Sequence, residues 1–374
     1  MVLGHVNDLR ETLRTLPCGA ALLEAAAGRH DAHLVGGAVR DLLRGGRPAE
    51  LDVAVEGDTT ALLAALGGRP LRHERFGTAT VQAGDCRIDV AMTRAEDYPA
   101  PGALPEVRPA GLREDLLRRD FTVNAIALGL GDGELRDAAG GLADLDAGLL
   151  RVLHDRSFID DPTRLWRLAR YRARLGFAIE PRTRELAQEA VAGGALATVS
   201  PARIGNELRL ALAEPDPVAA LRSAVELGLA PWLAVDGAVA PSVPDADPAL
   251  TLLAAVARDL PELGLPAGWA RTVATATALR GRVPAGAPAS VAARAYDGAP
   301  PEAVAALGTP EAERWLRRDR HRRLAITGDD LIAAGVARGP ELGARLLAVR
   351  DALLDGRVAD DHAEQLALAL ASSP

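Results

Sequence analysis

The sequence predicts an α/β N-terminal head, built on a small mixed sheet with helices, followed by an all-α remainder. Short runs of β-branched residues at 51–55, 78–82 and 87–91 favour strands between residue 31 and about residue 150. From about residue 151, leucine and alanine recur at helical spacing and strand signals almost disappear. This order of patterns indicates one mixed sheet early in the chain and helical packing after it.

Length and composition narrow the functional classes. The chain has 374 residues, a formal charge of −8 and only 3% aromatic residues. The charge excludes a uniformly basic coat, so any surface that binds nucleic acid must be local. All 43 basic residues are arginine, which excludes chemistry that requires lysine. Cys18 and Cys86 show no metal-ligand spacing and fit a reducing cytosol, and no apolar run reaches the length of a membrane span.

The first motif is a glycine pair between an expected strand and an expected helix. Residues 1–30 predict one or two amphipathic helices that end near Gly28, and the apolar run 33–35 then reaches Gly36 and Gly37. Glycine lets the backbone approach an anion closely, and the N-terminus of the helix expected from Ala38 offers free N–H groups to phosphate. A glycine pair before a helix is also common as a simple turn, so both interpretations stay open.

Acidic residues follow the glycine pair. Glu50 and Asp52 stand two residues apart on the next expected strand, which places both side chains on one face. Asp89 lies on a candidate neighbouring strand and offers a third carboxylate. Because hard cations prefer such oxygens, the three residues predict a magnesium site for a bound triphosphate. The alternative is a solvated acidic strand face.

A second polar motif surrounds Phe121. Arg118 and Arg119 offer donors for phosphate, and Asp120 and Asn124 suit a ribose hydroxyl. The alternative is a surface cluster of salt bridges beside a core phenylalanine. The residues alone do not separate the two interpretations.

The segment 160–176 predicts an arginine-rich helix. Asp161 suits the N-cap, Pro162 the first helical position and Gly176 the end. Nine arginines against four acidic residues between 151 and 184 predict a local surface for RNA phosphates. The arginines expected on one stripe of the helix are Arg164, Arg167, Arg170 and Arg174, with Tyr171 as the alternative to Arg170.

Asp161 and Arg164 lie three residues apart at the start of this helix and present an acceptor beside donors. Cytosine and adenine each show an amino donor next to a ring-nitrogen acceptor, whereas uracil and guanine show the reverse. A rigid Asp–Arg pair therefore predicts acceptance of C and A and rejection of U and G. The alternative is an ordinary N-cap with an ion pair along the helix.

Together these motifs resemble the class II tRNA nucleotidyltransferase (CCA-adding enzyme) and poly(A) polymerase family, within the polymerase-β-like nucleotidyltransferases. Residues 31–210 carry the resemblance densely, and residues 326–332 are similar to a tail motif of the family. The motifs follow the family's order along the chain, in the segments 36–41 and 50–52, 118–124, 137–145, 160–164, and 200–207.

The resemblance implies a division into a nucleotidyltransferase head (1–150), a helical neck with a nucleobase template (151–210), a helical body (211–300) and a helical tail (301–374). It implies addition of C and/or A from CTP and ATP to the 3′ end of tRNA in the cytoplasm, with two Mg²⁺ ions. In that reaction Glu50 and Asp52 would hold the metals. The further residues implied at the site are Asp89 as a catalytic carboxylate; Gly36, Gly37, Arg40, Arg118, Asp120, Asn124, Asp161, Arg164, Arg167 and Arg170 for the nucleotide; and Asp41, Arg203 and Glu207 as supports.

One departure from the family's pattern leaves alternatives open. The family has Asp-x-Asp where this chain has Glu50 and Asp52, and the longer glutamate changes the reach of one carboxylate. A catalytically weak RNA-binding homologue is therefore one alternative, and poly(A) tailing, A-only or CC-only addition are others. The segment 314–323 contains six arginines and is expected either to contact the tRNA or to form a solvated helix face. Protein partners and oligomeric state are not readable from the sequence.

Overall fold

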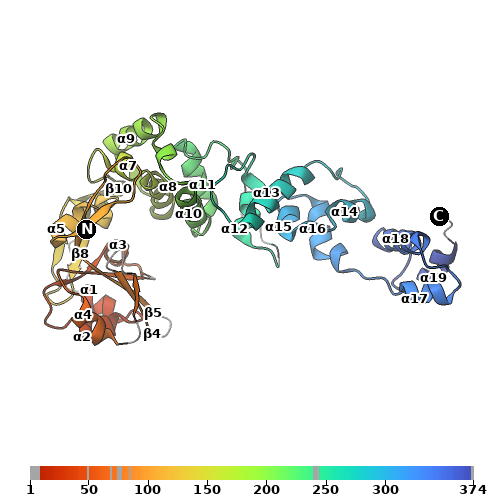
Figure 1. The fold of residues 1–374 in the computed structure, drawn as a ribbon, viewed down its shortest axis with the longest axis horizontal. Coiled ribbons are helices and arrows are strands. Elements are labelled where there is room, and N and C mark those ends of the chain that lie inside the picture. The colour runs from red at the N-terminus through yellow and green to blue at the C-terminus, as the bar shows by residue number, and fades with distance from the viewer. Residues whose placement is uncertain are drawn as a thin grey trace. The chain divides into compact units, whose positions relative to one another are not determined.

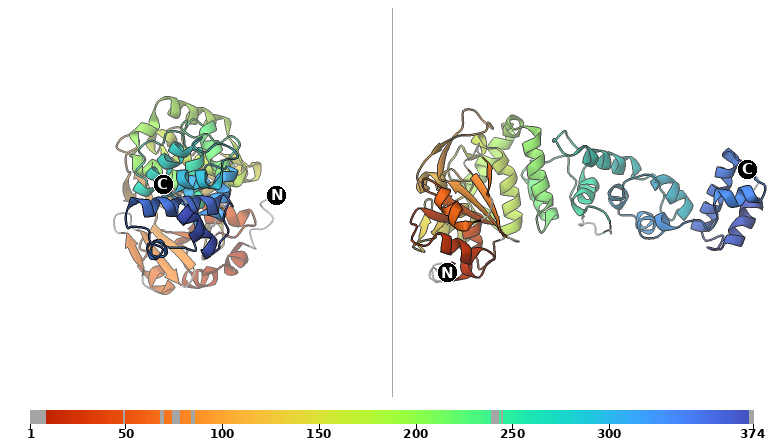
Figure 2. Two further views of the ribbon diagram at one scale, coloured as in Figure 1. Left: turned by 90° about the vertical axis from the view of Figure 1, so that its right-hand side faces the viewer. Right: turned by 60° about the horizontal axis from the view of Figure 1, so that its bottom comes forward.

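The computed structural model describes residues 9–48, 50–67, 70–73, 78–83, 86–238, 243 and 245–371, without the side chains of residues 72, 73, 83 and 86. The chain divides into two compact units, Met1–Ala230 and Pro231–Pro374. Each unit is described by itself. Figures 1 and 2 show the first unit as a sheet with helices and the second as helices and connecting segments.

A mixed sheet forms the head of the first unit. Its described strands are ordered β3-β4-β5-β2-β1-β8-β9, and β2 and β5 run parallel whereas the other neighbouring pairs are antiparallel. The strands are β1 (Ala32–Val35), β2 (Leu51–Val55), β3 (Leu71–His73), β4 (Thr78–Ala83), β5 (Cys86–Met92), β8 (Ile126–Gly129) and β9 (Leu135–Asp137). Two smaller pairs are β6 (Arg94–Asp97) with β7 (Glu106–Pro109), and β10 (Leu149–Leu150) with β11 (Ala178–Ile179).

Helices pack beside this sheet and continue beyond it. In the head they are α1 (Leu9–Arg14), α2 (Gly19–Ala25), α3 (Gly37–Leu43), α4 (Thr60–Leu66), α5 (Leu112–Leu117) and α6 (Gly141–Ala147), with the 3₁₀ turn η3 (Thr122–Asn124). After the head they are α7 (Ser157–Asp160), α8 (Thr163–Leu175), α9 (Pro181–Ala192), α10 (Pro201–Leu212) and α11 (Pro217–Glu226), with η4 (Ala195–Thr198). Figure 1 shows α7 to α11 as a helical group next to the sheet.

The core of the head fixes α5 against the sheet. Leu112 and Leu116 are four residues apart, so they share one face of α5. Both are buried with Val35 of β1 and Ala54 of β2 in one cluster. This packing places the C-terminal end of α5, and the arginines that follow it, beside the middle of the sheet.

The second unit is helical in its described part. Its helices are α12 (Pro248–Val256), α13 (Ala267–Leu279), α14 (Ala289–Tyr296), α15 (Pro301–Ala305), α16 (Pro310–Arg317), α17 (Gly328–Ala333), α18 (Pro340–Leu354) and α19 (His362–Ala371), with η5 (Asp319–His321). One buried cluster gathers around Tyr296 and Trp315, whose rings meet edge to face. A second cluster joins α17, α18 and α19 through Leu331, Val349 and Ala369.

The predicted fold class is confirmed: a mixed sheet with helices is followed by helices. The four-part division stays a prediction, since the contacts divide the chain only once, after Ala230. The loop expected at 236–248 lies partly outside the described residues, as does the start of the helix expected in 1–30. None of the helices in the described ranges is long and apolar enough to cross a membrane.

The cysteines require a correction. Cys18 is disulfide-bonded, which does not fit the reducing cytosol expected from the cysteine content. The side chain of Cys86 lies outside the described residues.

Candidate functional site

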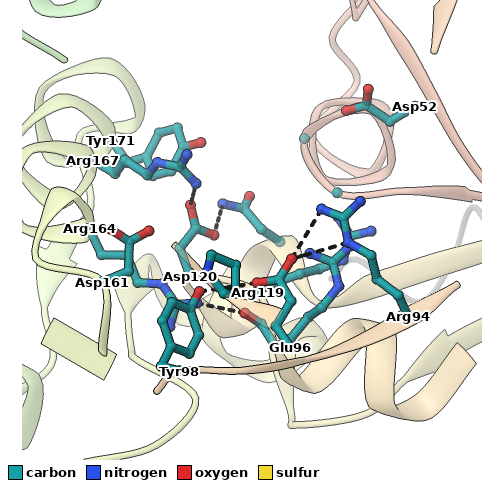
Figure 3. Close-up of a pocket in the computed structure, with 15 residues that line it drawn as sticks. Asp52, Arg94, Glu96, Tyr98, Arg119, Asp120, Asp161, Arg164, Arg167 and Tyr171 are labelled. Atoms are coloured by element: carbon teal, nitrogen blue, oxygen red, sulfur yellow. Dashed lines mark hydrogen bonds and ion pairs between the residues drawn. The ribbon is translucent and has the colours of Figure 1, made fainter. Parts of the chain in front are cut away.

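A cavity of about 370 Å³ lies within the first unit, between the sheet and the helices that follow it. Figure 3 shows Asp52 and Arg94 at one side of this cavity and Asp161 and Arg164 at the opposite side, with Asp120 between them. The residues that line it are Gly36, Gly37, Asp52, Arg94, Glu96, Tyr98, Pro105, Arg118, Arg119, Asp120, Asn124, Asp161, Arg164, Arg167 and Tyr171.

The glycine turn forms one wall of the cavity. Strand β1 ends at Val35, and Gly36 caps α3 with a φ of 70°, a conformation that side chains other than glycine rarely adopt. A Cβ atom added to Gly36 would lie 2.9 Å from Nη1 of Arg119 and 4.0 Å from Oδ2 of Asp52. The turn, an arginine and a carboxylate therefore meet at one place, which is where the sequence predicts Asp52.

Two of the three expected carboxylates are neighbours on the sheet. Asp52 of β2 is paired in register with Asp89 of β5 in a parallel ladder, so both side chains lie on the same face. Oδ1 of Asp89 accepts a hydrogen bond from Thr80 at 2.5 Å, and Oδ2 pairs with Arg87 at 2.9 Å. Burial raises the pKa of Asp52 above its usual range, and Asp89 and Glu50 raise it further against the opposing effect of Arg119.

Glu50 does not lie on the strand face that the sequence predicts for it. It precedes β2, which begins at Leu51, and its side chain is 62% exposed and pairs with Arg87 at 3.7 Å. The expected shared face with Asp52 requires Glu50 to belong to the strand, and the strand starts one residue too late for that. The structure therefore brings Asp52, and not Glu50, to the cavity wall.

The carboxylates present fit a hard divalent cation. Asp52 carries a buried charge beside like charges, and a cation would relieve that repulsion. Within the described residues no group of three or more His, Cys, Asp or Glu side chains is arranged to hold a metal ion by itself. Mg²⁺ commonly uses one or two carboxylates and takes its other ligands from substrate phosphates and water, which matches Asp52 and Asp89 beside a phosphate site.

Three arginines stand beside Asp52 on the cavity wall. Arg118 and Arg119 follow α5, and both donate to the carboxylate of Asp115. Arg94 of β6 and Arg118 also donate to Glu96. The buried Nε of Arg119 has no hydrogen-bond partner in the part of the chain that the structure describes. An arginine with unused donors beside a glycine turn suits a phosphate group.

The middle of the cavity carries the residues expected at the ribose. Asp120 accepts from the backbone N–H of Phe121 at 2.8 Å and from Nδ2 of Asn124 at 2.9 Å. Burial alone would raise its pKa, but Arg167 and Asn124 outweigh burial and hold the pKa below its usual value. Asp120 is therefore a charged acceptor at the cavity wall, consistent with binding a hydroxyl.

Arg40 does not lie where its expected role in nucleotide binding would require. It is only 2% exposed, donates from Nη1 to Oδ1 of Asn124 at 2.6 Å, and pairs with Asp41 at 2.8 Å. Its guanidinium lies over the ring of Tyr171, 5.4 Å from the ring centre. Arg40 therefore lies behind the cavity wall and fixes Asn124, instead of facing the cavity.

Asp161 and Arg164 line the far end, each held by a different partner. Oδ1 of Asp161 accepts from Arg203 at 2.8 Å and from Oγ1 of Thr163 at 2.6 Å. Nη1 of Arg164 donates to Ser157 at 2.8 Å, and Nη2 donates to the carbonyl of Arg118 at 2.7 Å. Asp161 therefore has its ion pair with Arg203 of α10, and it also accepts from the backbone N–H of Thr163 at 3.2 Å, as a helix cap does. The choice between a base-reading pair and an ordinary cap stays a prediction.

The arginine stripe of α8 is mostly an internal network. Arg170 donates to Glu214 at 2.9 Å and to Glu207 at 3.0 Å, and Arg174 donates to Glu214 at 2.6 Å. The Glu214 side chain is 1% exposed. The expected phosphate surface is therefore wrong for Arg170, which is buried and paired with carboxylates of α10 and the turn after it. Arg174 pairs with Glu214 but its side chain is 38% exposed, so its place on such a surface stays a prediction. Arg167 reaches the cavity and pairs with Asp120 at 3.5 Å.

Several lining residues were missed from the sequence. Arg94, Glu96 and Tyr98 belong to β6 and the loop after it, which carried no motif. Tyr98 donates to Glu96 at 3.1 Å, and burial raises its pKa to about 12. Tyr171 was expected only as part of the stripe. Arg119 was expected with Arg118 as a phosphate donor, but its place beside Gly36 depends on tertiary packing and gave no sequence signal.

Comparison with known proteins gives two family matches. Residues 32–151 match the family described as "Poly A polymerase head domain". Residues 176–234 match "Probable RNA and SrmB- binding site of polymerase A". The first match contains the glycine turn and Asp52.

Relatives and solved structures agree with these matches. The chain is 42% identical over 241 residues to an A-adding tRNA nucleotidyltransferase of Halalkalibacterium halodurans, a match that covers 62% of this chain but only 55% of that relative's length. It is 39% identical to the CC-adding tRNA nucleotidyltransferase of Deinococcus radiodurans, covering 90% of this chain and 88% of that protein. The structure of the Thermotoga maritima CCA-adding enzyme complexed with tRNA matches with a TM-score of 0.76 at 26% identity, covering 98% of each chain.

Proposed function

The chain belongs to the class II tRNA nucleotidyltransferase and poly(A) polymerase family, and from this premise we propose that it adds C and/or A from CTP and ATP to the 3′ end of tRNA. The single observation that carries the proposal is the cavity that joins Asp52 and the Gly36 turn at one side to Asp161 and Arg164 at the other. A nucleoside triphosphate laid across it meets a chemically suitable group at each of its three parts.

We assign the triphosphate to the side of Gly36, Gly37 and Arg119. The backbone turn admits close approach, and the N-terminus of α3 and the arginine attract negative charge. Asp120 and Asn124 then lie at the ribose. In the reaction the RNA 3′-oxygen bonds to the α-phosphorus, the bond from that phosphorus to the β-phosphate oxygen breaks, and pyrophosphate leaves.

Asp52 and Asp89 are the proposed holders of Mg²⁺, and Glu50 remains a third candidate because its charge acts on the pKa of Asp52. Two Mg²⁺ ions bound there would neutralise charge on the attacking oxygen and on the departing pyrophosphate. The protein's own part is to hold the carboxylates on adjacent parallel strands, facing the glycine turn.

The base is assigned to Asp161 and Arg164. Arg203 holds Asp161, and Ser157 and the Arg118 carbonyl hold Arg164, so both side chains are fixed before a nucleotide arrives. Fixed polar groups discriminate strongly, because a base with the wrong pattern leaves them unpaired. This arrangement supports acceptance of C and A over U and G.

The order of nucleotides added is the finer part of the proposal. The match over 90% of the chain to a CC-adding relative supports C as one substrate, and the A-adding relative supports A. CCA, CC-only and A-only addition and poly(A) tailing all use the same cavity. A cytoplasmic location is proposed with the tRNA substrate, and the disulfide of Cys18 is the observation that counts against it.

A tRNA extension assay tests the function. Purified protein with Mg²⁺ is given a labelled tRNA that lacks its 3′ CCA, with CTP, ATP, both, or UTP and GTP. We expect lengthening with CTP, ATP or both and none with UTP or GTP. RNA binding without any lengthening would instead establish the alternative of a non-catalytic homologue, which the exposed position of Glu50 favours.

A further inference from the structure

We propose that Asp115 is a positioning residue for the triphosphate: its carboxylate holds Arg118 and Arg119 in the orientation in which they meet the phosphates. The inference rests on the proposed function, because it names which residue prepares that same cavity for its substrate. Asp115 lies in the middle of α5 and carries no motif in the sequence.

The contacts of Asp115 converge on the cavity wall. Oδ1 accepts from Nη2 of Arg118 at 2.7 Å and from Nε of Arg118 at 3.0 Å, while Oδ2 accepts from Nη2 of Arg119 at 2.9 Å. Oδ1 also accepts from the backbone N–H of Arg94 at 3.2 Å, at the start of β6. One carboxylate thus touches all three arginines that line the phosphate side of the cavity.

Burial makes this carboxylate a fixed anchor. Asp115 is 1% exposed, and its α5 helix is packed on the sheet through Leu112 and Leu116. Burial alone would raise its pKa, but Arg119 and Arg118 outweigh burial and lower it, so the group is charged at neutral pH. Glu96 is the second anchor, since it accepts from Arg118 at 2.8 Å and from Arg94 at 3.1 Å.

The physical consequence is preorganisation. An arginine side chain has many rotamers, and fixing them when a ligand binds lowers affinity. Asp115 and Glu96 fix the guanidinium groups in advance. Among the described residues this leaves Nε of Arg119 without a hydrogen-bond partner and its Nη1 beside the Gly36 turn. A triphosphate offers oxygens to these donors, so the effect of Asp115 should fall on the phosphate tail and not on the base.

Asp115→Asn tests this assignment in the full-length protein. CTP and CMP are titrated separately in the presence of Mg²⁺ and without RNA, because CMP keeps the base and ribose but lacks the β- and γ-phosphates. Loss of charge-assisted hydrogen bonds to the arginines is expected to weaken CTP binding by about tenfold to a hundredfold. CMP binding is expected to stay within about twofold of the wild-type value, since CMP makes fewer phosphate contacts.

Asp319→Asn is the matched control. Asp319 is another buried aspartate that holds two arginines, Arg314 at 3.1 Å and Arg318 at 2.8 Å, but it belongs to the second unit. The same chemical change there should leave CTP affinity unchanged. If Asp115→Asn fails to fold, Glu96→Gln is used in its place. Glu96→Gln is also expected to weaken CTP binding more than CMP binding.

The outcomes separate the two proposals. Unchanged CTP affinity in a folded variant, or an equal loss of CTP and CMP affinity, would overturn the positioning role of Asp115 while wild-type tRNA extension left the proposed function standing. A wild-type protein that binds CTP but never lengthens tRNA would overturn the proposed function. In that case, a loss of CTP affinity without loss of CMP affinity in Asp115→Asn would still support the positioning role.

Discussion

At the scale of single residues, the proposed role of Asp52 as a metal ligand opposes its effect on the stability of the fold. Burial and neighbouring carboxylates raise its pKa, so its ionised form is unfavourable in the folded protein without metal. A folded-state pKa above the unfolded value means that stability is lost as pH rises through the titration of the group. On the proposed function, Asp52 supplies a metal ligand at a cost in stability.

The variant Asp52→Asn should therefore lose activity and gain stability. We expect tRNA extension to fall at least about a hundredfold, because one ligand of the metal and its charge are removed. In EDTA the melting temperature should equal or exceed that of the wild type. Extension near the wild-type rate would remove Asp52 from the metal site, and a large fall in melting temperature would contradict the stated direction of its pKa shift.

Asp161→Ala should change which base is accepted. Asp161 lies at the far side of the cavity from Asp52, so its loss should relax the choice among the four nucleotides more than it weakens triphosphate binding. Incorporation of each nucleotide into tRNA, measured as kcat/KM, checks this. An unchanged preference for C and A would argue against a role of Asp161 in reading the base.

At the scale of elements, the sequence predicts the turn from β1 to α3 better than it predicts the contacts of helix α8. Strands β1, β2, β4 and β5 and the glycine turn were predicted, because apolar or β-branched runs and a glycine pair are local signals. The short strands β3, β6, β7, β8 and β9 were not predicted. Glu207 was expected as a support of α8 only through the family resemblance. Glu214 was not predicted, since it lies 44 residues after Arg170 and is brought to it only by helix packing. For the same reason Asp115, Arg94 and Tyr98 gave no signal.

Gly36→Ala tests the turn. Its positive φ makes alanine costly, by about 1 kcal/mol or more, and the added Cβ would meet Arg119 at the phosphate side. Gly45→Ala is the control, because Gly45 has a φ of 74° at the other end of α3 and nothing lies within 4 Å of an added Cβ. Both variants should lose similar stability, whereas only Gly36→Ala should raise KM for CTP or ATP. Equal KM values for the two variants would show that the turn does not take part in nucleotide binding.

The network of α8 makes a prediction about stability. Glu214→Gln removes a buried charge that holds Arg170 and Arg174, and should lower the free energy of unfolding by about 3 kcal/mol or more. Glu226→Gln is the control, because its pair with Arg172 is exposed and should contribute less than about 1 kcal/mol. Urea denaturation measures both. A loss of tRNA affinity in Glu214→Gln without loss of stability would restore the stripe as an RNA surface.

At the scale of the whole molecule, all residues that line the cavity belong to the unit Met1–Ala230, which has its own sheet and core. Units with their own cores commonly fold alone. The arginines of 314–323 belong to the second unit, where Arg314 and Arg318 pair with Asp319 and Arg317 pairs with Glu313. The proposed nucleotide site therefore belongs to the first unit, and contact of the second unit with tRNA stays a prediction.

A fragment of residues 1–230 should bind CTP within about threefold of the full chain, since no part of the cavity is removed. Its affinity for tRNA should be lower, because the second unit is absent. Titration of both ligands against fragment and full chain gives the comparison. A folded fragment without measurable CTP binding would mean that the second unit contributes to the nucleotide site.

The central claim is that one nucleotide lies across the cavity with its phosphates at Asp52 and its base at Asp161. A crystal structure with CTP and Mg²⁺ tests it most directly. The account predicts the triphosphate against Gly36 and Arg119, the cation on Asp52 and Asp89, and the cytosine edge within hydrogen-bond distance of Asp161 and Arg164. CTP bound outside the cavity, or with its phosphates at the Asp161 side, would contradict the account.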